Sequence, residues 1–497
     1  MKNTKIIIVA MFVGIFNSCD DFLNVAPDRD IFATKANAYK TDADFESGIM
    51  GCYKTFAQTY NDNLLIIANT MADDSYNPRV SQFDNTAYLK LFKPGQSDIL
   101  IFWSLWQKSY AAVRNVNLLL NYVQTADIST DLKIKYEAEA RFLRAYLYFD
   151  LVKVWGDVPL VLEPLENVNE AYSIIRTPKA DVYNQIYSDV DYAINNLTES
   201  HDPSRTNVYA ARMLKARVLL YDAGATFKYD NEAISLLNGI TGFELMENFS
   251  DLFNNPSKEN SKESIFELQF AATTGMGTKV PSSFTNSDYI KGVPVGSVPN
   301  GTNDCAPSPK LIELMSSDDD KRKASTWEWY GKSIGKPINA ANPVNIKFTF
   351  MIPSTSFVNE AGNNIILMRY ADVLLLRAEI NARLNPNDQT LALADLNLIR
   401  NRAGAGSLAN TLTNDEVKNF IDLERFKELA FEGQRWWDLI RTGRAIAVIN
   451  EFNQRPDMVS KFLPYTPSLM TEDFYVFAIP FQVIDNNPKI TQNPNLN

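Results

Sequence analysis

Four stretches of the chain repeat their apolar residues at helical spacing. In the first, Phe142, Ala145, Phe149 and Val152 follow Ala138 at intervals that place all five on one face of a helix. The Gly-Asp-Val-Pro sequence at 156–159 predicts where this helix ends. The other three stretches are Ala211–Tyr221, Ala371–Ala382 and Leu391–Arg402, with predicted ends near Gly224, Asn385 and Gly404. The pattern therefore predicts a mainly α fold.

Small alanines recur among the large apolar residues of these helix faces. Small side chains let helices approach closely, which favours stacked helical hairpins of the tetratricopeptide type. No clean repeat of about 34 residues is visible, so any repeats are expected to be degenerate. An irregular helical bundle explains the spacing equally well.

Two stretches lack this helical pattern. Residues 240–365 are rich in Gly, Pro, Ser, Thr and Asn, with short strand-like runs at Ile265–Phe270 and Asn345–Ile352. Residues 73–99 form a smaller polar segment between two helical stretches. Because long excursions on a helical scaffold are usually functional or disordered, we expect the binding residues in these two stretches.

The first residues read as an export signal. Lys2 and Lys5 precede an apolar run of eleven residues, Ile6–Phe16, which is shorter than the roughly 20 residues that span a bilayer. Cys19 follows at the expected cleavage point, which predicts a signal peptide over 1–18 and lipid attachment to Cys19. An ordinary signal peptide that happens to contain a cysteine is the alternative. Both interpretations place the protein outside the cytoplasm.

Composition narrows the possible partners and the redox chemistry. After loss of residues 1–18, 46 basic and 59 acidic residues leave a net charge of −13, which disfavours binding to nucleic acid. The two remaining cysteines, Cys52 and Cys305, are expected to be free buried thiols rather than a disulfide, because a chain this long does not need one. No metal-ligand spacing and no cofactor motif is apparent.

Several separated motifs together resemble one protein family. They are DDFLNVAP after Cys19, FDLVKVWGDVPLV, LMRYADVLLLRAE, ALADLNLIRNRAG, ERFKELAFEGQRWWDLIRTG and the closing FAIPFQVIDNNPKITQNP. In this order they resemble the SusD/RagB family of bacterial surface lipoproteins. The resemblance runs from Cys19 to the C-terminus and suggests an N-terminal part over 19–230 and a C-terminal part over 231–497, joined in one compact unit.

The resemblance implies both a fold and a role. It implies a SusD-like helical scaffold with tetratricopeptide-type hairpins and long loops that form a ligand-binding face. Family members capture nutrients, mostly oligosaccharides, and sit on SusC-like TonB-dependent transporters in the outer membrane. The acidic pair Asp20-Asp21 resembles the signal that sends such lipoproteins to the cell surface. We therefore expect a non-catalytic, lipid-anchored glycan-binding protein. A surface glycoside hydrolase and a transporter-associated scaffold without its own ligand are the alternatives.

Sugar binding requires exposed aromatic rings for the apolar ring face and planar polar groups for the hydroxyls. The two irregular stretches supply this mixture, and in the family the equivalent loops contact ligand. The expected ligand-binding residues are Asp73, Asp74, Tyr76, Asn77, Arg79, Phe83, Tyr88, Phe92, Phe284, Tyr289, Trp327, Trp329 and Tyr330. If 327–330 is a strand, Trp327 and Trp329 share one face. The chain has 58 aromatic residues, and most aromatic residues in a protein belong to the core, so a core role is the alternative for each of these rings.

Other candidate sites are interpreted as structural. Glu432, Arg435 and Asp438 have the i,i+3 spacing of charge pairs along one helix, which favours a structural segment over a glycosidase centre at 424–443. His201, the only histidine, lies in a loop-like sequence and has no evident catalytic partner. The run Asp318–Asp320 lacks the spacing of a calcium loop. Trp103, Trp106 and Tyr110 lie on a strongly apolar helix and are expected in the core, although Trp103 is placed to reach the nearby loop.

Overall fold

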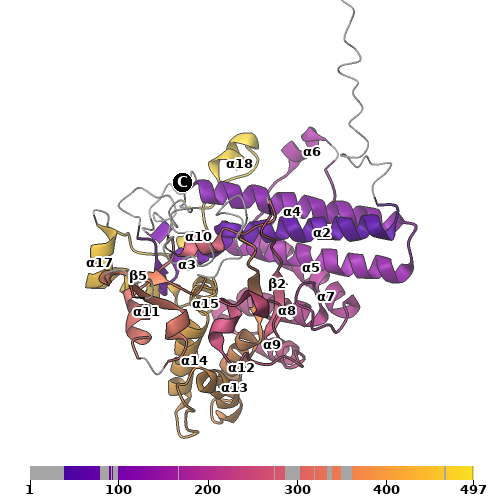
Figure 1. Cartoon of the computed structure of the whole chain (residues 1–497). Coiled ribbons are helices and arrows are strands. Elements are labelled where there is room, and N and C mark those ends of the chain that lie inside the picture. Colours follow the sequence, from indigo (N-terminus) through magenta and orange to yellow (C-terminus); the bar gives the residue numbers. More distant parts are fainter. Residues whose placement is uncertain are drawn as a thin grey trace, which may run out of the picture.

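The computed structural model describes residues 39–497 apart from 79–88, 91, 93–98, 166, 274, 286–302, 318–319, 333–337, 349–360, 464–465, 495 and 497. Cys19 and the predicted signal peptide therefore lie outside the described residues. The described chain is mostly helical (Figure 1). Its first helices are α2 (Asp42–Thr59), α3 (Leu65–Met71), α4 (Leu100–Thr125), α5 (Thr130–Trp155), α6 (Val168–Ser173), α7 (Lys179–Asn196), α8 (Val208–Ala223) and α9 (Asp230–Asn238).

The rest of the chain adds shorter helices and three strand pairs. The helices are α10 (Val280–Phe284), α11 (Pro309–Leu314), α12 (Tyr370–Leu384), α13 (Thr390–Arg402), α14 (Asn414–Glu428), α15 (Arg435–Arg441), α16 (Ala445–Gln454), α17 (Pro456–Phe462) and α18 (Phe481–Asn486). The antiparallel pairs are β1 (Ser75–Tyr76) with β3 (Ala306–Pro307), β2 (Ser264–Leu268) with β6 (Ile365–Arg369), and β4 (Trp327–Tyr330) with β5 (Asn339–Asn345).

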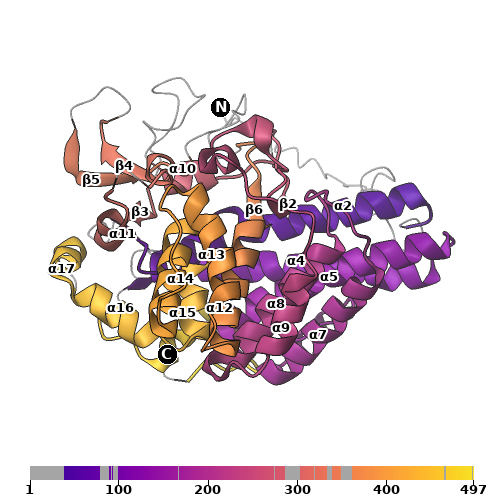
Figure 2. The ribbon, with the colours of Figure 1, turned by 90° about the horizontal axis from the view of Figure 1, so that it is seen from below.

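Successive long helices pack against one another, so the predicted mainly α, SusD-like helical fold is confirmed. α4 contacts α5, α5 contacts α7, α7 contacts α8, and α12 contacts α13 (Figures 1 and 2). The predicted ends also hold, because α5 stops before Gly156 and α8 before Gly224, both at positive φ. Glycine tolerates this left-handed backbone, which is why the helices end there.

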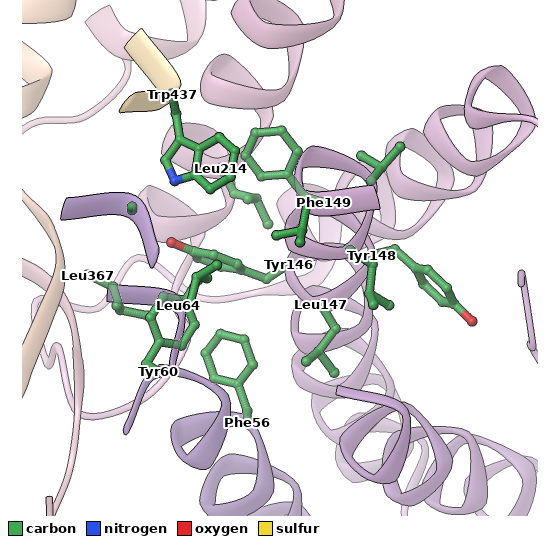
Figure 3. Close-up of a cluster of buried hydrophobic side chains, with 14 of the residues drawn as sticks. Phe56, Tyr60, Leu64, Tyr146, Leu147, Tyr148, Phe149, Leu214, Leu367 and Trp437 are labelled. Atoms are coloured by element: carbon green, nitrogen blue, oxygen red, sulfur yellow. The ribbon is translucent and has the colours of Figure 1, made fainter. Parts of the chain in front are cut away.

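One hydrophobic cluster extends from Phe45 near the N-terminal end of the described chain to Leu496 near its C-terminal end. Figure 3 shows its aromatic centre, where Phe56 and Tyr146 meet edge to face at 5.3 Å between ring centroids. Trp437 of α15 reaches the same cluster (Figure 3). This shared core fixes the helices from both ends of the chain relative to one another.

The irregular 240–365 stretch contains the predicted short strands, with one correction. β2 falls within the expected Ile265–Phe270 run apart from its first residue. The second run is wrong over its described part: β5 ends at Asn345, where the predicted strand begins, and Lys347 and Phe348 form a turn. Residues 349–352 of that run lie outside the described residues. β5 lies earlier because it pairs with β4, with Trp327 opposite Asn345 and Trp329 opposite Pro343.

The segment after α14 also differs from the prediction. Glu432, Arg435 and Asp438 do not share one helix, because Phe431 and Gly433 adopt positive φ between α14 and α15. Glu432 instead pairs with Arg369 and Lys347, while Asp438 pairs with Arg425 and Arg441. The structural role of this segment holds, but only the Asp438–Arg441 pair lies within one helix, and the partners of Glu432 come from other elements.

Three smaller predictions are also tested. Cys52 and Cys305 are both free and buried, as expected. His201 is exposed in a loop, with Nε2 3.1 Å from the carbonyl of Thr241. Of the Asp318–Asp320 run, Asp320 is ion-paired with Arg322, and the other two residues lie outside the described residues. In the described chain no cluster of His, Cys, Asp and Glu side chains is placed to hold a metal ion. None of the described helices combines the length and apolar character that a membrane span needs.

Candidate functional site

A pocket of about 270 Å³ lies where the β1–β3 and β4–β5 pairs meet α11 and α17. Figure 2 shows β3, β4, β5, α11 and α17 grouped at one end of the molecule. We call this cavity the Trp329 pocket. Its lining residues are Tyr76, Pro307, Pro309, Ile312, Glu313, Trp329, Pro343, Arg455, Asp457 and Lys461. Two of the predicted ligand-binding residues, Tyr76 and Trp329, meet here from distant parts of the sequence.

Buried polar contacts fix β1 beneath this pocket. The carboxylate of Asp73 accepts hydrogen bonds from Arg435 Nε at 2.7 Å and Lys310 Nζ at 2.6 Å. Burial alone raises the pKa of a carboxyl, but the Arg435 charge outweighs it and holds the pKa of Asp73 well below its usual range. Ser308, at the start of α11, donates its hydroxyl to the Asp73 carbonyl at 2.8 Å. β1 is thus tied to α11 and α15.

Asp74 has the opposite electrostatic environment. Its side chain is buried and accepts a hydrogen bond from the backbone N–H of Phe431 at 3.1 Å. Burial raises the pKa of Asp74 to about 6, and the neighbouring Asp73 charge adds to this shift. Asp73 and Asp74 therefore position the strand, and their side chains offer no free surface to a ligand.

Trp329 supplies the accessible aromatic side chain of the pocket. It is partly buried on β4, and its ring meets that of Trp327 edge to face at 5.3 Å. Tyr76 forms the base: it is almost fully buried against Phe452, Met458 and Phe462, and burial raises its pKa to about 12. The Lys461 amino group lies 5.5 Å from the Tyr76 ring centroid. The pocket thus combines a stacking surface with a polar rim.

The charged rim of the pocket is balanced. Arg455 bonds to Asp457 at 3.0 Å and to Glu313 at 3.2 Å. The hydrogen bond from Arg455 lowers the pKa of Asp457, so that carboxylate is ionised at neutral pH. Two acidic and two basic side chains, counting Lys461, leave no net charge among the lining residues. This balance suits an uncharged ligand with hydroxyl groups better than a strongly anionic one.

Several of the predicted ligand-binding aromatic residues are buried rather than exposed. Phe92 packs edge to face on Phe474, Phe284 does so on Phe348, and Trp327 is only 4% exposed. The full set of predicted ligand residues that the structure buries is Asp73, Asp74, Tyr76, Asn77, Phe92, Phe284 and Trp327. The aromatic members are buried because the loops fold onto the helical core, where apolar side chains gain most from leaving water.

The remaining predicted residues divide into two groups. Trp329 and Tyr330 are partly exposed, and their ligand contacts remain a prediction. Arg79, Phe83, Tyr88 and Tyr289 lie outside the described residues.

Sequence reasoning missed the α17 side of the pocket. Arg455, Asp457 and Lys461 line it, while Met458 and Phe462 of the same helix face the core. Pro456 at the first helical position signals the helix start. No local signal, however, places this helix beside β4, more than 120 residues earlier.

Comparison with known proteins supplies the family. Residues 345–495 match the family model described as the SusD family, and residues 21–220 match one described as "Starch-binding associating with outer membrane". The chain belongs to the SusD family. A SusD-like protein of Formosa agariphila is 25% identical over 527 residues, covering 99% of each chain.

Solved structures support the fold of this SusD-family protein. A "Laminarin binding SusD-like protein" aligns with a TM-score of 0.74 at 22% identity, covering 92% of this chain and 100% of that one. "Surface glycan-binding protein A from Bacteroides thetaiotaomicron in complex with laminarihexaose" aligns with a TM-score of 0.72 at 22% identity, covering 91% and 100%. The two family models include Tyr76 and α17, whereas Trp329 lies between them.

Proposed function

We propose that this SusD-family protein binds an oligosaccharide in the Trp329 pocket without chemically changing it. The observation that carries the proposal is a partly exposed Trp329 in a pocket with proline walls and a charge-balanced rim. A pyranose ring stacks its C–H face on an indole, while carboxylate and guanidinium groups bond its hydroxyls. The printed names of the laminarin- and laminarihexaose-binding relatives support a glycan ligand.

The same pocket disfavours the glycoside hydrolase alternative. Glycosidases keep one carboxylic acid protonated, with a raised pKa, beside a second carboxylate. Here Arg455 contacts both Glu313 and Asp457, and its hydrogen bond lowers the pKa of Asp457. An ion-paired carboxylate of this kind is a hydrogen-bond acceptor for a sugar hydroxyl rather than a proton donor.

Isothermal titration calorimetry of residues 20–497 tests the proposal. The probes are laminarihexaose, maltohexaose, cellohexaose and xylohexaose, with chromatography of the mixture to detect cleavage. We expect saturable binding of one glycan class without products, and at least tenfold weaker binding at the pocket in Trp329→Ala. Tyr229→Ala, a partly buried aromatic side chain remote from the pocket lining, serves as the control. Absence of binding to every probe, or release of shorter sugars, contradicts the proposal.

The cellular part of the proposal follows from the sequence and the family. Lipid on Cys19 anchors the protein in the outer membrane, facing outward, and bound glycan passes to a SusC-like TonB-dependent transporter. The family description "associating with outer membrane" supports the location. Co-purification of the full-length lipoprotein with a TonB-dependent transporter from detergent-solubilised outer membranes tests the partnership, and Cys19→Ala should release the protein from the membrane fraction.

A further inference from the structure

A second and larger groove lies along α4, away from the Trp329 pocket. Its volume is about 920 Å³, and it shares no lining residue with that pocket. α4 forms the floor, residues 159–165 form one wall, and α6 with α18 forms the other. In Figure 1, α6 and α18 stand above α4. We call this feature the α4 groove.

One stripe of α4 alternates between apolar side chains, two of them aromatic, and polar side chains. Its members lining the groove are Trp103, Gln107, Tyr110, Arg114, Leu118 and Asn121, spaced four, three, four, four and three residues apart. This spacing keeps them on one face, and at 1.5 Å rise per residue the stripe is about 27 Å long. The apolar pattern of this helix predicts Trp103, Trp106 and Tyr110 in the core. Only Trp106 is buried, whereas Trp103 and Tyr110 are partly exposed.

The polar members of the stripe are available to a ligand. Gln107, Arg114 and Asn121 are exposed, and none of their side chains has a hydrogen-bond or ion-pair partner in the described part of the chain. Glu163 on the opposite wall is likewise exposed and unpaired there. Amide, guanidinium and carboxylate groups are the planar donors and acceptors that bond pairs of sugar hydroxyls.

The groove is held open by hydrogen bonds within its walls. Tyr110 donates its hydroxyl to the carbonyl of Pro159 at 2.9 Å, and Asn117 donates its amide to that of Val161 at 2.8 Å. On the other side, the Asn487 amide donates to the carbonyls of Ala171 and Ile174, which ties α18 to α6. A preformed groove loses little conformational entropy on binding, which favours affinity.

We propose that the α4 groove is a second glycan-binding site, which takes an extended oligosaccharide along α4; this inference rests on the proposed glycan-binding function. The rings stack on sugar faces and the intervening polar side chains bond hydroxyls. A docked protein helix favours a continuous apolar stripe with few charges at its centre. Here Arg114 and two amides interrupt the stripe, so its pattern matches a glycan better.

Two sites on one molecule give a distinct binding signature. An oligosaccharide long enough to fill the stripe binds this groove more tightly than a disaccharide of the same linkage. A polysaccharide that reaches both sites binds more tightly than either site alone allows, because the second contact becomes intramolecular.

The test combines variants of both sites. Gln107→Ala/Arg114→Ala removes two exposed side chains that have no partner in the described chain, so folding is unaffected. Tyr229→Ala remains the control. The titration uses the hexaose that the wild type binds. Calorimetry should give two binding sites for the wild type, one for the groove variant and one for Trp329→Ala. The combined variant should bind none, and affinity for the matching polysaccharide in gel retardation should fall about tenfold in each single-site variant.

The outcomes separate this inference from the proposed function. If the groove variant keeps the wild-type stoichiometry and affinity while Trp329→Ala abolishes binding, the second site is wrong and the proposed function stands. If Trp329→Ala changes nothing and the groove variant loses all binding, the groove is the glycan site and the pocket assignment is wrong. Loss of transporter co-purification in the groove variant with unchanged glycan binding identifies a protein-docking surface and overturns the inference. If the wild type binds none of the hexaoses and none of the polysaccharides, both proposals are overturned.

Discussion

Two tryptophans on one strand show how position within a few ångströms decides the role of a residue. Trp327 and Trp329 of β4 lie side by side, with ring centroids 5.3 Å apart. Trp327 faces the core, and its indole N–H has no hydrogen-bond partner among the described residues. Trp329 instead lines the candidate pocket. Alternation along the strand predicts their common face, but it does not predict which ring is covered.

This difference leads to a paired prediction. Trp327→Ala should lower the free energy of unfolding by roughly 3–5 kcal/mol, because it leaves a cavity in the core. Trp329→Ala should lower it much less, while weakening glycan binding. Urea unfolding followed by far-UV circular dichroism measures the first effect, and calorimetric titration measures the second. Equal losses of stability in the two variants would show that Trp329 is also a core residue.

The buried charge of Asp73 gives a second residue-scale prediction. Asp73→Asn removes the more buried of the two carboxylate partners of Arg435, leaving Asp422 as the other, and the poorly compensated guanidinium should cost about 3–5 kcal/mol of stability. The control is Asp415→Asn, because Asp415 is 92% exposed and lies 3.8 Å from Lys418. That exposed pair should contribute less than about 1 kcal/mol. Urea unfolding of both variants measures the difference, and similar small losses would contradict the structural role of Asp73.

At the scale of elements, the sequence predicts helices better than the breaks between them. Apolar spacing located α5, α8, α12 and α13, because long amphipathic helices repeat their signal over many residues. The sequence did not predict the break between α14 and α15, because Phe431 adopts positive φ there and nothing in the sequence indicates this backbone conformation for a phenylalanine. Gly433 was the one local sign of that turn, but the spacing of Glu432, Arg435 and Asp438 around it suggested charge pairs along one helix instead.

Gly433 tests this interpretation of the break. It has φ +72°, and an added Cβ would lie 3.1 Å from Leu65 Cδ2, so Gly433→Ala should destabilise the fold by more than about 1 kcal/mol. Gly51 provides the matched control, because it lies inside α2 with no atom within 4 Å of an added Cβ. Gly51→Ala should leave stability unchanged or raise it by up to about 1 kcal/mol. Thermal and urea unfolding compare the two, and equal behaviour would contradict the assigned backbone strain.

At the scale of the whole molecule, the site depends on contacts that sequence alone does not reveal. The motifs indicated the family, and composition indicated aromatic loops. Yet the Trp329 pocket needs β1, β4, α11 and α17 together. β1 pairs with β3, β3 contacts β5, and β5 pairs with β4, while Tyr76 of β1 packs against α17. Such long-range pairings leave no periodic trace in the sequence. The α4 groove is the opposite case. Its stripe can be seen in the sequence, but Trp103 and Tyr110 are interpreted as core residues until α6 and α18 are placed.

Buried carboxyl groups make the stability of the whole molecule depend on pH in two opposite ways. Burial raises the pKa of Asp74 and Asp395 to about 6 and that of Glu259 to about 7. For Asp372 and Asp422, burial is outweighed by arginines, chiefly Arg425 and Arg435 respectively, and their pKa values fall to about 2.

The sign of each effect follows from which state binds more protons. Between pH 7 and about 4 the native state takes up protons on the three raised groups, so lowering the pH should stabilise the fold. Below pH 4 the unfolded chain protonates Asp372 and Asp422 first, so the stability from their ion pairs is lost towards pH 2. Urea unfolding at pH 7, 5.5, 4.5 and 3 should therefore show a maximum between pH 4 and 5.5. Asp74→Asn should flatten the rise and leave the acid loss intact, whereas a steady decline from pH 7 downward would contradict these assignments.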